Sequence, residues 1–232
     1  MSRKLVLFDI DGTILVTAGA GRRAIVKAIG EDVGTTGAFL GIRFDGKTDP
    51  QIVSELLSAA GHAPPHEASR VAALCERYVA LLEHELTRAD VEATVMPGIH
   101  DLLDRLEARE DVLLGLLTGN LERGATLKLR AAGFAPERFA VGAYGSDAAD
   151  RSALPAIAAA RAAARLGTAP SGHAVVIIGD TPADIACGAG IGARAIGVAT
   201  GGYSVEDLAA HGPHAVFPDL SDTERVLAAI LD

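Results

Sequence analysis

Short apolar runs recur along this chain, and most are followed by a polar turn and then by a segment with helical character. This alternation repeats from Val112 onward, and an earlier run, Leu5–Phe8, also ends on a polar turn. A strand–helix series of this kind places its strands in parallel, with helices on both faces. We therefore predict an α/β fold built on a doubly wound parallel sheet. The expected strands cover 5–8, 112–117, 139–141, 175–178, 194–198 and 215–217, and the expected helices 98–108, 121–133, 152–166, 183–190 and 221–231.

The segment 16–93 breaks this alternation, because it contains no convincing strand. Three helices are expected in it, and we assign Asp49 as the N-cap of the second, with Pro50 at its first position. The chain is therefore predicted to form a core from residues 1–15 and 94–232, with an α-helical cap inserted over 16–93. The expected cap helices cover 21–29, 49–60 and 66–88.

Composition narrows the classes of function. Hydrophobic residues make up 49% of the 232 residues, which is enough for a sizeable core. The net charge of −9, the absence of a Lys/Arg run and only 4% aromatic residues argue against a nucleic-acid partner. No apolar window is long enough to span a membrane, and two cysteines suggest neither a disulfide framework nor a zinc cluster. The N-terminus turns acidic too early for a signal peptide, so a cytoplasmic location is expected.

Three polar clusters stand directly after expected strands: Asp9–Thr13, Thr118–Asn120 and Gly179–Thr181. Ligands of open parallel sheets bind outside the carboxyl ends of the strands. These clusters are far apart in sequence, yet the fold would bring them to one edge. Their shared context is more informative than any one of them.

The carboxylates of these clusters suggest a metal. Asp9 and Asp11, two residues apart at a strand end, would face the same way. They can coexist if a cation binds them, or if one is charged and the other protonated. Asp180 and Asp184 add two further carboxylates, and oxygen ligands are those that Mg²⁺ prefers. The other reading is that Asp180 caps a helix whose first turn holds Asp184.

Thr118-Gly119-Asn120 offers a hydroxyl group and free backbone N–H groups at a helix start, which could bind a phosphate. A plain N-cap would explain the tripeptide equally well. An acidic chain that binds phosphate also needs local positive charge in the site, such as a metal ion.

These motifs resemble those of the haloacid dehalogenase (HAD) superfamily in its phosphatase form. Asp9-Ile10-Asp11-Gly12-Thr13 looks like the first motif, Thr118 stands at the second, and Gly179-Asp180 followed by Asp184 looks like the fourth. The order fits the whole chain. The helical segment 16–93 is similar to the cap of the branch resembling phosphoglycolate phosphatase and β-phosphoglucomutase. Gly46-Lys47-Thr48-Asp49 is similar to a recurring cap segment of that branch.

The resemblance implies a HAD-like Rossmannoid core, a magnesium cofactor and a small phosphorylated metabolite as substrate. Asp9 would be the nucleophile, and Asp11 would protonate the leaving group and then activate water. Mg²⁺ would be held by Asp9, the backbone carbonyl of Asp11 and Asp180. The remaining motif residues have supporting roles in the same scheme. Asp184 would orient metal ligands, Thr118 would hydrogen-bond a phosphoryl oxygen, and Gly119 and Asn120 would line the substrate site.

The third motif departs from the family pattern, which has a lysine before the penultimate strand. The chain has four lysines, and none lies between Gly133 and Val175. Arg151 is the best substitute, because its fork could bridge Asp9 and a phosphoryl oxygen, although arginine is not equivalent to lysine. A solvated loop charge is the other reading of Arg151. Lys128 is expected on a helix surface.

The cap would select the substrate. Lys47 and Thr48 are expected to reach the pocket. Arg22, Arg23 and Arg43 are each candidates for binding a substrate carboxylate or second phosphate, and a solvated position is the simpler expectation for all three.

Other activities remain open at this level. A sugar phosphomutase of the β-phosphoglucomutase type would share every core motif, and a phosphonate hydrolase would add a cap lysine such as Lys47. A dehalogenase does not need Asp11, and a non-catalytic binding protein would be expected to lack one of the three motif carboxylates. The sequence does not identify the metabolite or the oligomeric state.

Overall fold

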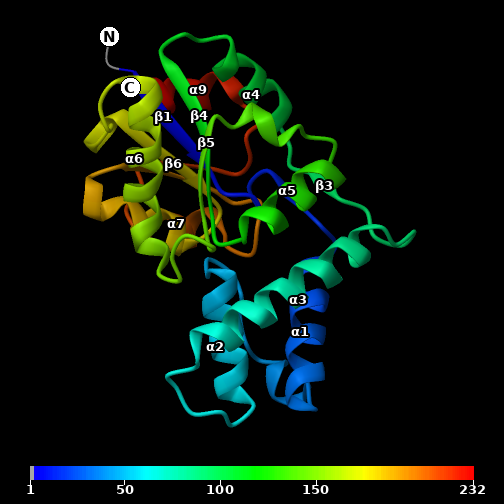
Figure 1. Cartoon of the computed structure of the whole chain (residues 1–232). Coiled ribbons are helices and arrows are strands. Elements are labelled where there is room, and N and C mark those ends of the chain that lie inside the picture. The colour runs from blue at the N-terminus through cyan, green and yellow to red at the C-terminus, as the bar shows by residue number, and fades with distance from the viewer. Residues whose placement is uncertain (1–2) are drawn as a thin grey trace.

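The computed structural model describes residues 3–232 and is organised around a six-stranded sheet (Figure 1). All neighbouring strands are parallel, in the order β5-β4-β1-β6-β7-β8. The order runs outward on both sides of β1, so the sheet is doubly wound, as predicted. The strands are β1 (Lys4–Phe8), β4 (Val112–Thr118), β5 (Val141–Tyr144), β6 (Val175–Gly179), β7 (Arg194–Val198) and β8 (Ala215–Phe217).

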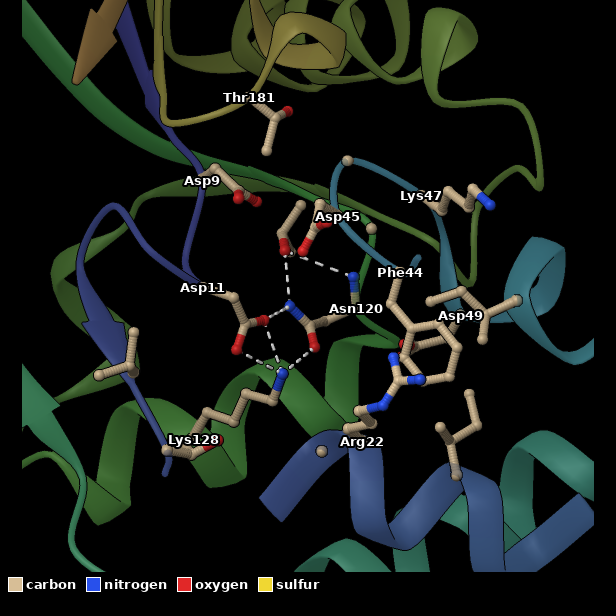
Figure 2. Close-up of a pocket in the computed structure, with 18 of the residues that line it drawn as sticks. Asp9, Asp11, Arg22, Phe44, Asp45, Lys47, Asp49, Asn120, Lys128 and Thr181 are labelled. Atoms are coloured by element: carbon tan, nitrogen blue, oxygen red, sulfur yellow. Dashed lines mark hydrogen bonds and ion pairs between the residues drawn. The ribbon is translucent and has the colours of Figure 1, made fainter. Parts of the chain in front are cut away.

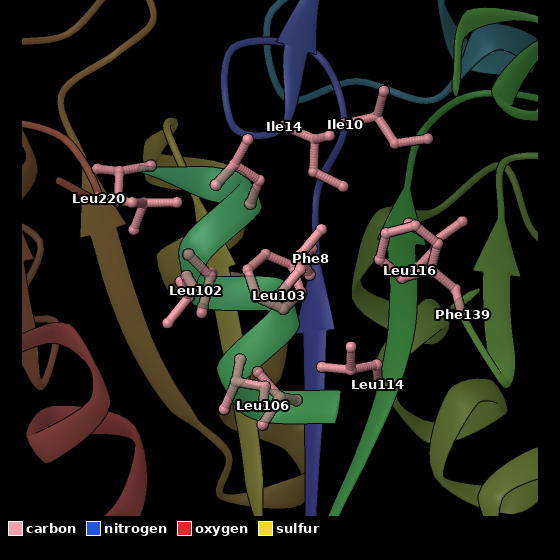
Figure 3. Packing of buried hydrophobic residues seen from close by; sticks show 14 of the residues in the cluster. Phe8, Ile10, Ile14, Leu102, Leu103, Leu106, Leu114, Leu116, Phe139 and Leu220 are labelled. Atoms are coloured by element: carbon pink, nitrogen blue, oxygen red, sulfur yellow. The ribbon is translucent and has the colours of Figure 1, made fainter. Parts of the chain in front are cut away.

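Helices cover both faces of this sheet because its strands are apolar on both sides. Val6 and Phe8 of β1 belong to one hydrophobic cluster, whereas Leu5 and Leu7 belong to another on the opposite face. Figure 3 shows the first cluster, where leucines of α4 pack against β1 and β4. The core helices are α4 (Ile99–Glu107), α5 (Glu122–Ala131), α6 (Leu154–Leu166), α7 (Pro182–Cys187), α8 (Val205–Ala209) and α9 (Thr223–Leu231).

The cap consists of α1 (Ala20–Val33), α2 (Asp49–Ala59) and α3 (Ala68–Leu86), which lie together beyond one end of the core (Figure 1). Their buried residues form a hydrophobic cluster of their own. Two short strands, β2 (Leu15–Val16) and β3 (Thr94–Val95), pair antiparallel where the chain enters and leaves this helical segment. The exact division of the chain into core and cap domains stays a prediction.

Three local expectations were wrong. Thr48, not Asp49, is the N-cap of α2, because its hydroxyl accepts the N–H of Gln51. The weak strand expected at 139–141 begins at Val141, where pairing with β4 starts. The sequence pattern also missed α8, which has only five residues. Among residues 3–232, no helix is both long and apolar enough to cross a membrane.

Candidate active site

The three polar clusters meet at one edge of the sheet, as their position after the strands predicts. Phe8 lies beside Leu116 of β4 and Ile178 of β6, so the turns that follow these strands are neighbours. Residues from all three turns line one cavity of about 280 Å³ between core and cap (Figure 2). The cavity is lined from the core by Asp9, Asp11, Thr118, Gly119, Asn120, Lys128, Arg151, Asp180 and Thr181.

Three carboxylates form a compact buried group. Asp9, Asp180 and Asp184 each offer an oxygen within 4.8 Å of the others, and all three are buried. Burial raises the pKa of Asp9 to about 7, with Asp184 and Asp11 adding to the rise and Arg151 opposing it. Burial also raises the pKa of Asp180 to about 9, and the charges of Asp184 and Asp9 add to this. The charge of Asp184 therefore makes it harder for both Asp9 and Asp180 to ionise.

This group has the chemistry of a site for a divalent metal ion. Its donors are hard carboxylate oxygens, and a bound cation would offset the repulsion that raises their pKa values. The surrounding backbone is packed closely against it, because a Cβ at Gly12 would lie 2.4 Å from Asp180 Oδ2. Gly12 has φ +83°, a conformation that favours glycine. The hydroxyl of Thr13 donates to Asp180 Oδ1 at 3.1 Å and fixes its orientation.

Arg151 is the only described cation that contacts this carboxylate group. Its side chain is 7% exposed, and its Nη2 lies 3.2 Å from Asp9 Oδ1 and pairs with Asp184. Its Nε is buried and has no hydrogen-bond partner among residues 3–232. Arg151 is thus in contact with Asp9 rather than solvated.

Asp184 has hydrogen-bond partners besides Arg151. One of its oxygens accepts the N–H of Thr181 at 3.0 Å and the hydroxyl of Thr181 at 2.7 Å, in a capping box at the start of α7. Asp184 therefore caps a helix and borders the carboxylate group at the same time.

Asp11 points away from this group, toward α5 (Figure 2). Lys128 Nζ donates to Asp11 Oδ1 at 2.8 Å and to Asp11 Oδ2 at 2.6 Å, and the side-chain amide of Asn120 donates to Oδ2 at 2.8 Å. Lys128 also donates to Asn120 Oδ1 at 2.7 Å. These bonds hold the Asp11 carboxylate in one direction at the cavity wall.

The expectation that Lys128 lies on a helix surface was wrong. Its side chain is only 5% exposed, because α5 packs this face against the cavity and the cap. A signal for this was present in the sequence. Lys128 follows Gly124 and Ala125 at helical spacing and precedes Leu129, and all four residues lie on the buried face of α5.

In the turn Thr118–Asn120, part of the predicted phosphate site is already hydrogen-bonded within the protein. Thr118 is fully buried, and its hydroxyl accepts both the N–H and the side-chain amide of Asn120, at 3.3 and 2.8 Å. The N–H of Leu121 donates to Asp49 Oδ2 at 2.8 Å. At these positions the N–H groups already have partners, so they are not free for a phosphate.

The cap reaches the site through the segment 45–49. The N–H of Asp49 donates to the carbonyl of Gly119 at 2.8 Å, and a Cβ at Gly119 would lie 2.1 Å from the Lys47 carbonyl. Lys47 lines the cavity, as predicted, but its ammonium group pairs with Glu55 at 2.5 Å. Thr48 is buried and donates to the carbonyl of Ala149 at 2.6 Å, and it is not among the cavity-lining residues in the described part of the chain.

Asp49 and Tyr78 complete the cap wall near Lys128, where neither residue was predicted to lie. Burial raises the pKa of Asp49 to about 6, while Lys128 and the N–H of Leu121 oppose the rise. Burial also raises the pKa of the Tyr78 hydroxyl well above its usual value. Asp49 belongs to the Gly46–Asp49 segment that the sequence already marks, whereas no local motif predicts Tyr78, which only the packing of cap on core brings to the cavity.

Comparison with known proteins agrees with this architecture. The model of the HAD-hydrolase-like family matches residues 153–223. A phosphoglycolate phosphatase of Cereibacter sphaeroides is 31% identical over 228 residues, which are 97% of this chain and 99% of that protein. Among solved structures, β-phosphoglucomutase of Clostridium difficile has a TM-score of 0.71 at 17% identity and covers 100% of this chain and 98% of its own. CbbY of Rhodobacter sphaeroides, solved with phosphate, has a TM-score of 0.69 at 21% identity, and the match covers 95% of this chain and 96% of that one.

Proposed function

This chain belongs to the haloacid dehalogenase superfamily, in the branch of phosphoglycolate phosphatases and β-phosphoglucomutases, and is a phosphatase; we propose that it hydrolyses a small phosphorylated metabolite through an aspartyl-phosphate on Asp9. Phosphoglycolate is the first substrate to test, because the similar proteins from Cereibacter sphaeroides and Rhodospirillum rubrum are named phosphoglycolate phosphatases. One observation carries the proposal. Asp9 lies buried beside Asp180 and Asp184, with Arg151 at 3.2 Å, in the wall of the cavity.

In the first step, an oxygen of Asp9 attacks phosphorus and the bond from phosphorus to the ester oxygen breaks. The electron pair of that bond moves to the ester oxygen, which takes a proton from the carboxyl group of Asp11. In the second step, water attacks the phosphorus of the aspartyl-phosphate and gives a proton to Asp11. The bond between Asp9 and phosphorus breaks, and inorganic phosphate leaves.

The neighbouring residues support these steps. Arg151 would hold Asp9 in place and, as a cation that lines the cavity, offer positive charge to a phosphoryl oxygen. Lys128 and Asn120 would keep the Asp11 carboxylate in a fixed direction. Asp9 and Asp180 would hold Mg²⁺ with the backbone carbonyl of Asp11, and Asp184 would orient them. The ion would supply positive charge to balance the carboxylates and the phosphate.

Phosphate release from phosphoglycolate tests this function, with Mg²⁺ and with EDTA, for the wild type and Asp9→Asn. Turnover should require both the metal and Asp9. The Asn side chain has nearly the same shape as that of Asp. A loss of activity in Asp9→Asn would therefore report lost nucleophilicity rather than lost packing. Metal-independent turnover, or full activity in Asp9→Asn, would refute the mechanism.

A further inference from the structure

The cavity has two unlike halves. Its core half carries the carboxylates and Arg151, where the phosphoryl group would bind. Its cap half has as many apolar side chains as polar or charged ones, the latter being Thr17, Arg22, Asp45, Lys47 and Asp49, so the part of the substrate beyond the ester oxygen meets both kinds. The apolar residues are Val16, Ile25, Phe44, Ile52 and Tyr78.

Four cationic side chains from the described part of the chain line the cavity, and three of them are ion-paired. Lys47 pairs with Glu55, Lys128 with Asp11, and Arg151 with Asp9 and Asp184. Arg22 has no such carboxylate within residues 3–232. It donates to two backbone carbonyls instead, from Nη1 to Ile42 at 3.0 Å and from Nη2 to Phe39 at 3.2 Å. Its positive charge is therefore not balanced by a neighbouring side chain.

Arg22 is also held in place before any ligand binds. Its guanidinium group lies 4.2 Å from the centre of the Phe44 ring, and the two carbonyls fix one side of it. Figure 2 shows Arg22 rising from α1 beside Phe44, whereas Asp9 lies on the core side of the pocket. A side chain that is ordered in advance loses less entropy on binding.

The other two cap arginines considered from the sequence are differently placed. Arg23 Nε pairs with Glu85 at 2.8 Å and its Nη1 donates to the carbonyl of Ala18 at 2.7 Å. Arg43 pairs with Asp45 at 2.9 Å. Neither Arg23 nor Arg43 is among the residues that line the cavity.

The acidic residues of the cap half are already bound. Asp45 pairs with Arg43, and Asp49 accepts the N–H of Leu121. They do not neutralise Arg22 through any hydrogen bond or ion pair within the described chain.

We propose that Arg22 is the residue that determines specificity, by binding a carboxylate at the far end of a short phosphomonoester. The proposal rests on the phosphatase function given above. The planar guanidinium fork matches a carboxylate. The cavity volume of about 280 Å³ lies just below the range typical of pockets for drug-sized ligands, which favours a substrate of few atoms.

The test compares two esters of the same shape, 2-phosphoglycolate and its carboxamide, 2-phosphoglycolamide. The two esters differ in the group remote from the phosphate, which is a charged carboxylate in the first and a neutral carboxamide in the second. We expect the wild type to prefer the carboxylate, and Arg22→Met to lower kcat/KM for that ester by about 10- to 100-fold, the worth of one charged hydrogen bond. Turnover of the carboxamide should change little. Because we assign Arg22 a contact that is equally strong in the ground state and in the transition state, the loss should lie mainly in KM.

Lys27→Met is the matched control, because Lys27 is an exposed cation on the same helix and does not line the cavity. The ratio of the two kcat/KM values within one preparation does not depend on how much of the variant is folded. An unchanged ratio in Arg22→Met overturns the role of Arg22 while leaving the phosphatase function intact. No turnover of either ester by the wild type overturns both proposals.

Discussion

At the scale of single residues, charge compensation dominates the cavity. One group of carboxylates consists of Asp9, Asp180 and Asp184, and Arg151 is the cation that contacts it among the described residues. The Asp11 carboxylate is separate, and both of its oxygens accept hydrogen bonds from Lys128. A buried charge is costly unless it is paired and hydrogen-bonded. Lys128 therefore depends on Asp11 and Asn120, and the direction of the Asp11 carboxylate depends in turn on Lys128.

Lys128→Met tests this dependence. Methionine fills a similar volume but cannot donate to Asp11, whose side chain is 45% exposed and would then be free to turn. We expect kcat/KM for phosphoglycolate to fall by about 10²-fold, the cost typical of a misplaced catalytic group. Steady-state kinetics of this variant and of the exposed-site control Lys27→Met provide the measurement.

A double variant separates positioning from general damage. If Lys128 acts through Asp11, then Lys128→Met should cost little more in an Asp11→Asn background. Equal losses in both backgrounds would show that Lys128 supports activity by another route.

At the scale of elements, helix α5 connects the core to the cap. Its first turn follows the Thr118–Asn120 turn, and the N–H of Leu121 is capped by Asp49, a residue of the cap helix α2. Asp49 is buried, and burial raises its pKa to about 6. Forming this contact therefore costs the free energy of removing the Asp49 carboxylate from water.

Asp49 gives a pH dependence whose sign follows from this shift. Its pKa is about 6 in the folded protein and 3.8 without the shift, so the folded state binds the extra proton between these values. Stability from this group is therefore present below about pH 4 and is lost as the pH rises through about 6. Relative to Asp49→Asn, the free energy of unfolding of the wild type should fall by up to about 3 kcal/mol across this window.

Urea unfolding of both proteins at several pH values between 4 and 7 measures that difference. Asparagine can still accept the N–H of Leu121, so the variant keeps the cap contact. A stability difference that stays constant across the window would mean that Asp49 ionises as an exposed carboxylate does.

Local patterns predicted most elements, and the reason is physical. The strands β7 and β8 were predicted at their observed bounds, and the polar turns after β1, β4 and β6 were placed correctly at one edge. Apolar runs and turn residues encode these features locally. The buried positions of Lys128 and Asp49 at the cavity were not predicted, because their environments are created by segments distant in sequence. The N–H of Leu121 is not free for the same reason, since it donates to Asp49 of the cap.

At the scale of the whole molecule, the site lies where two hydrophobic units meet. The cap helices share one cluster and the sheet with its helices share two others, and the cavity opens between them. The doubly wound sheet was predicted from the alternation of strands and helices along the chain. Which cap arginine faces the cavity was not predicted, because the direction of each side chain depends on how the cap packs, and only Arg22 of the three lines the cavity.

Magnesium binding should be coupled to pH for the folded molecule. Asp9 and Asp180 have pKa values of about 7 and about 9 in the metal-free protein, so binding a cation must release protons. The apparent affinity for Mg²⁺ should rise at least about tenfold from pH 6 to pH 8. Without metal, the same raised pKa values make stability fall as the pH rises through this range.

Calorimetric titration with Mg²⁺ in two buffers of different ionisation enthalpy measures the affinity and the protons released. Asp180→Asn should bind the ion weakly and release fewer protons. An affinity that is independent of pH in the wild type would contradict the assignment of Asp9 and Asp180 as ligands.

The most direct test of the account is to trap the phosphoryl group on the enzyme. Acid-quenching the protein during turnover of phosphoglycolate, followed by borohydride reduction and peptide mass analysis, converts an aspartyl-phosphate to homoserine at the phosphorylated position. We predict homoserine at position 9 in the wild type and none in Asp9→Asn. Turnover without any modification at position 9, or modification at another aspartate, would contradict the mechanism.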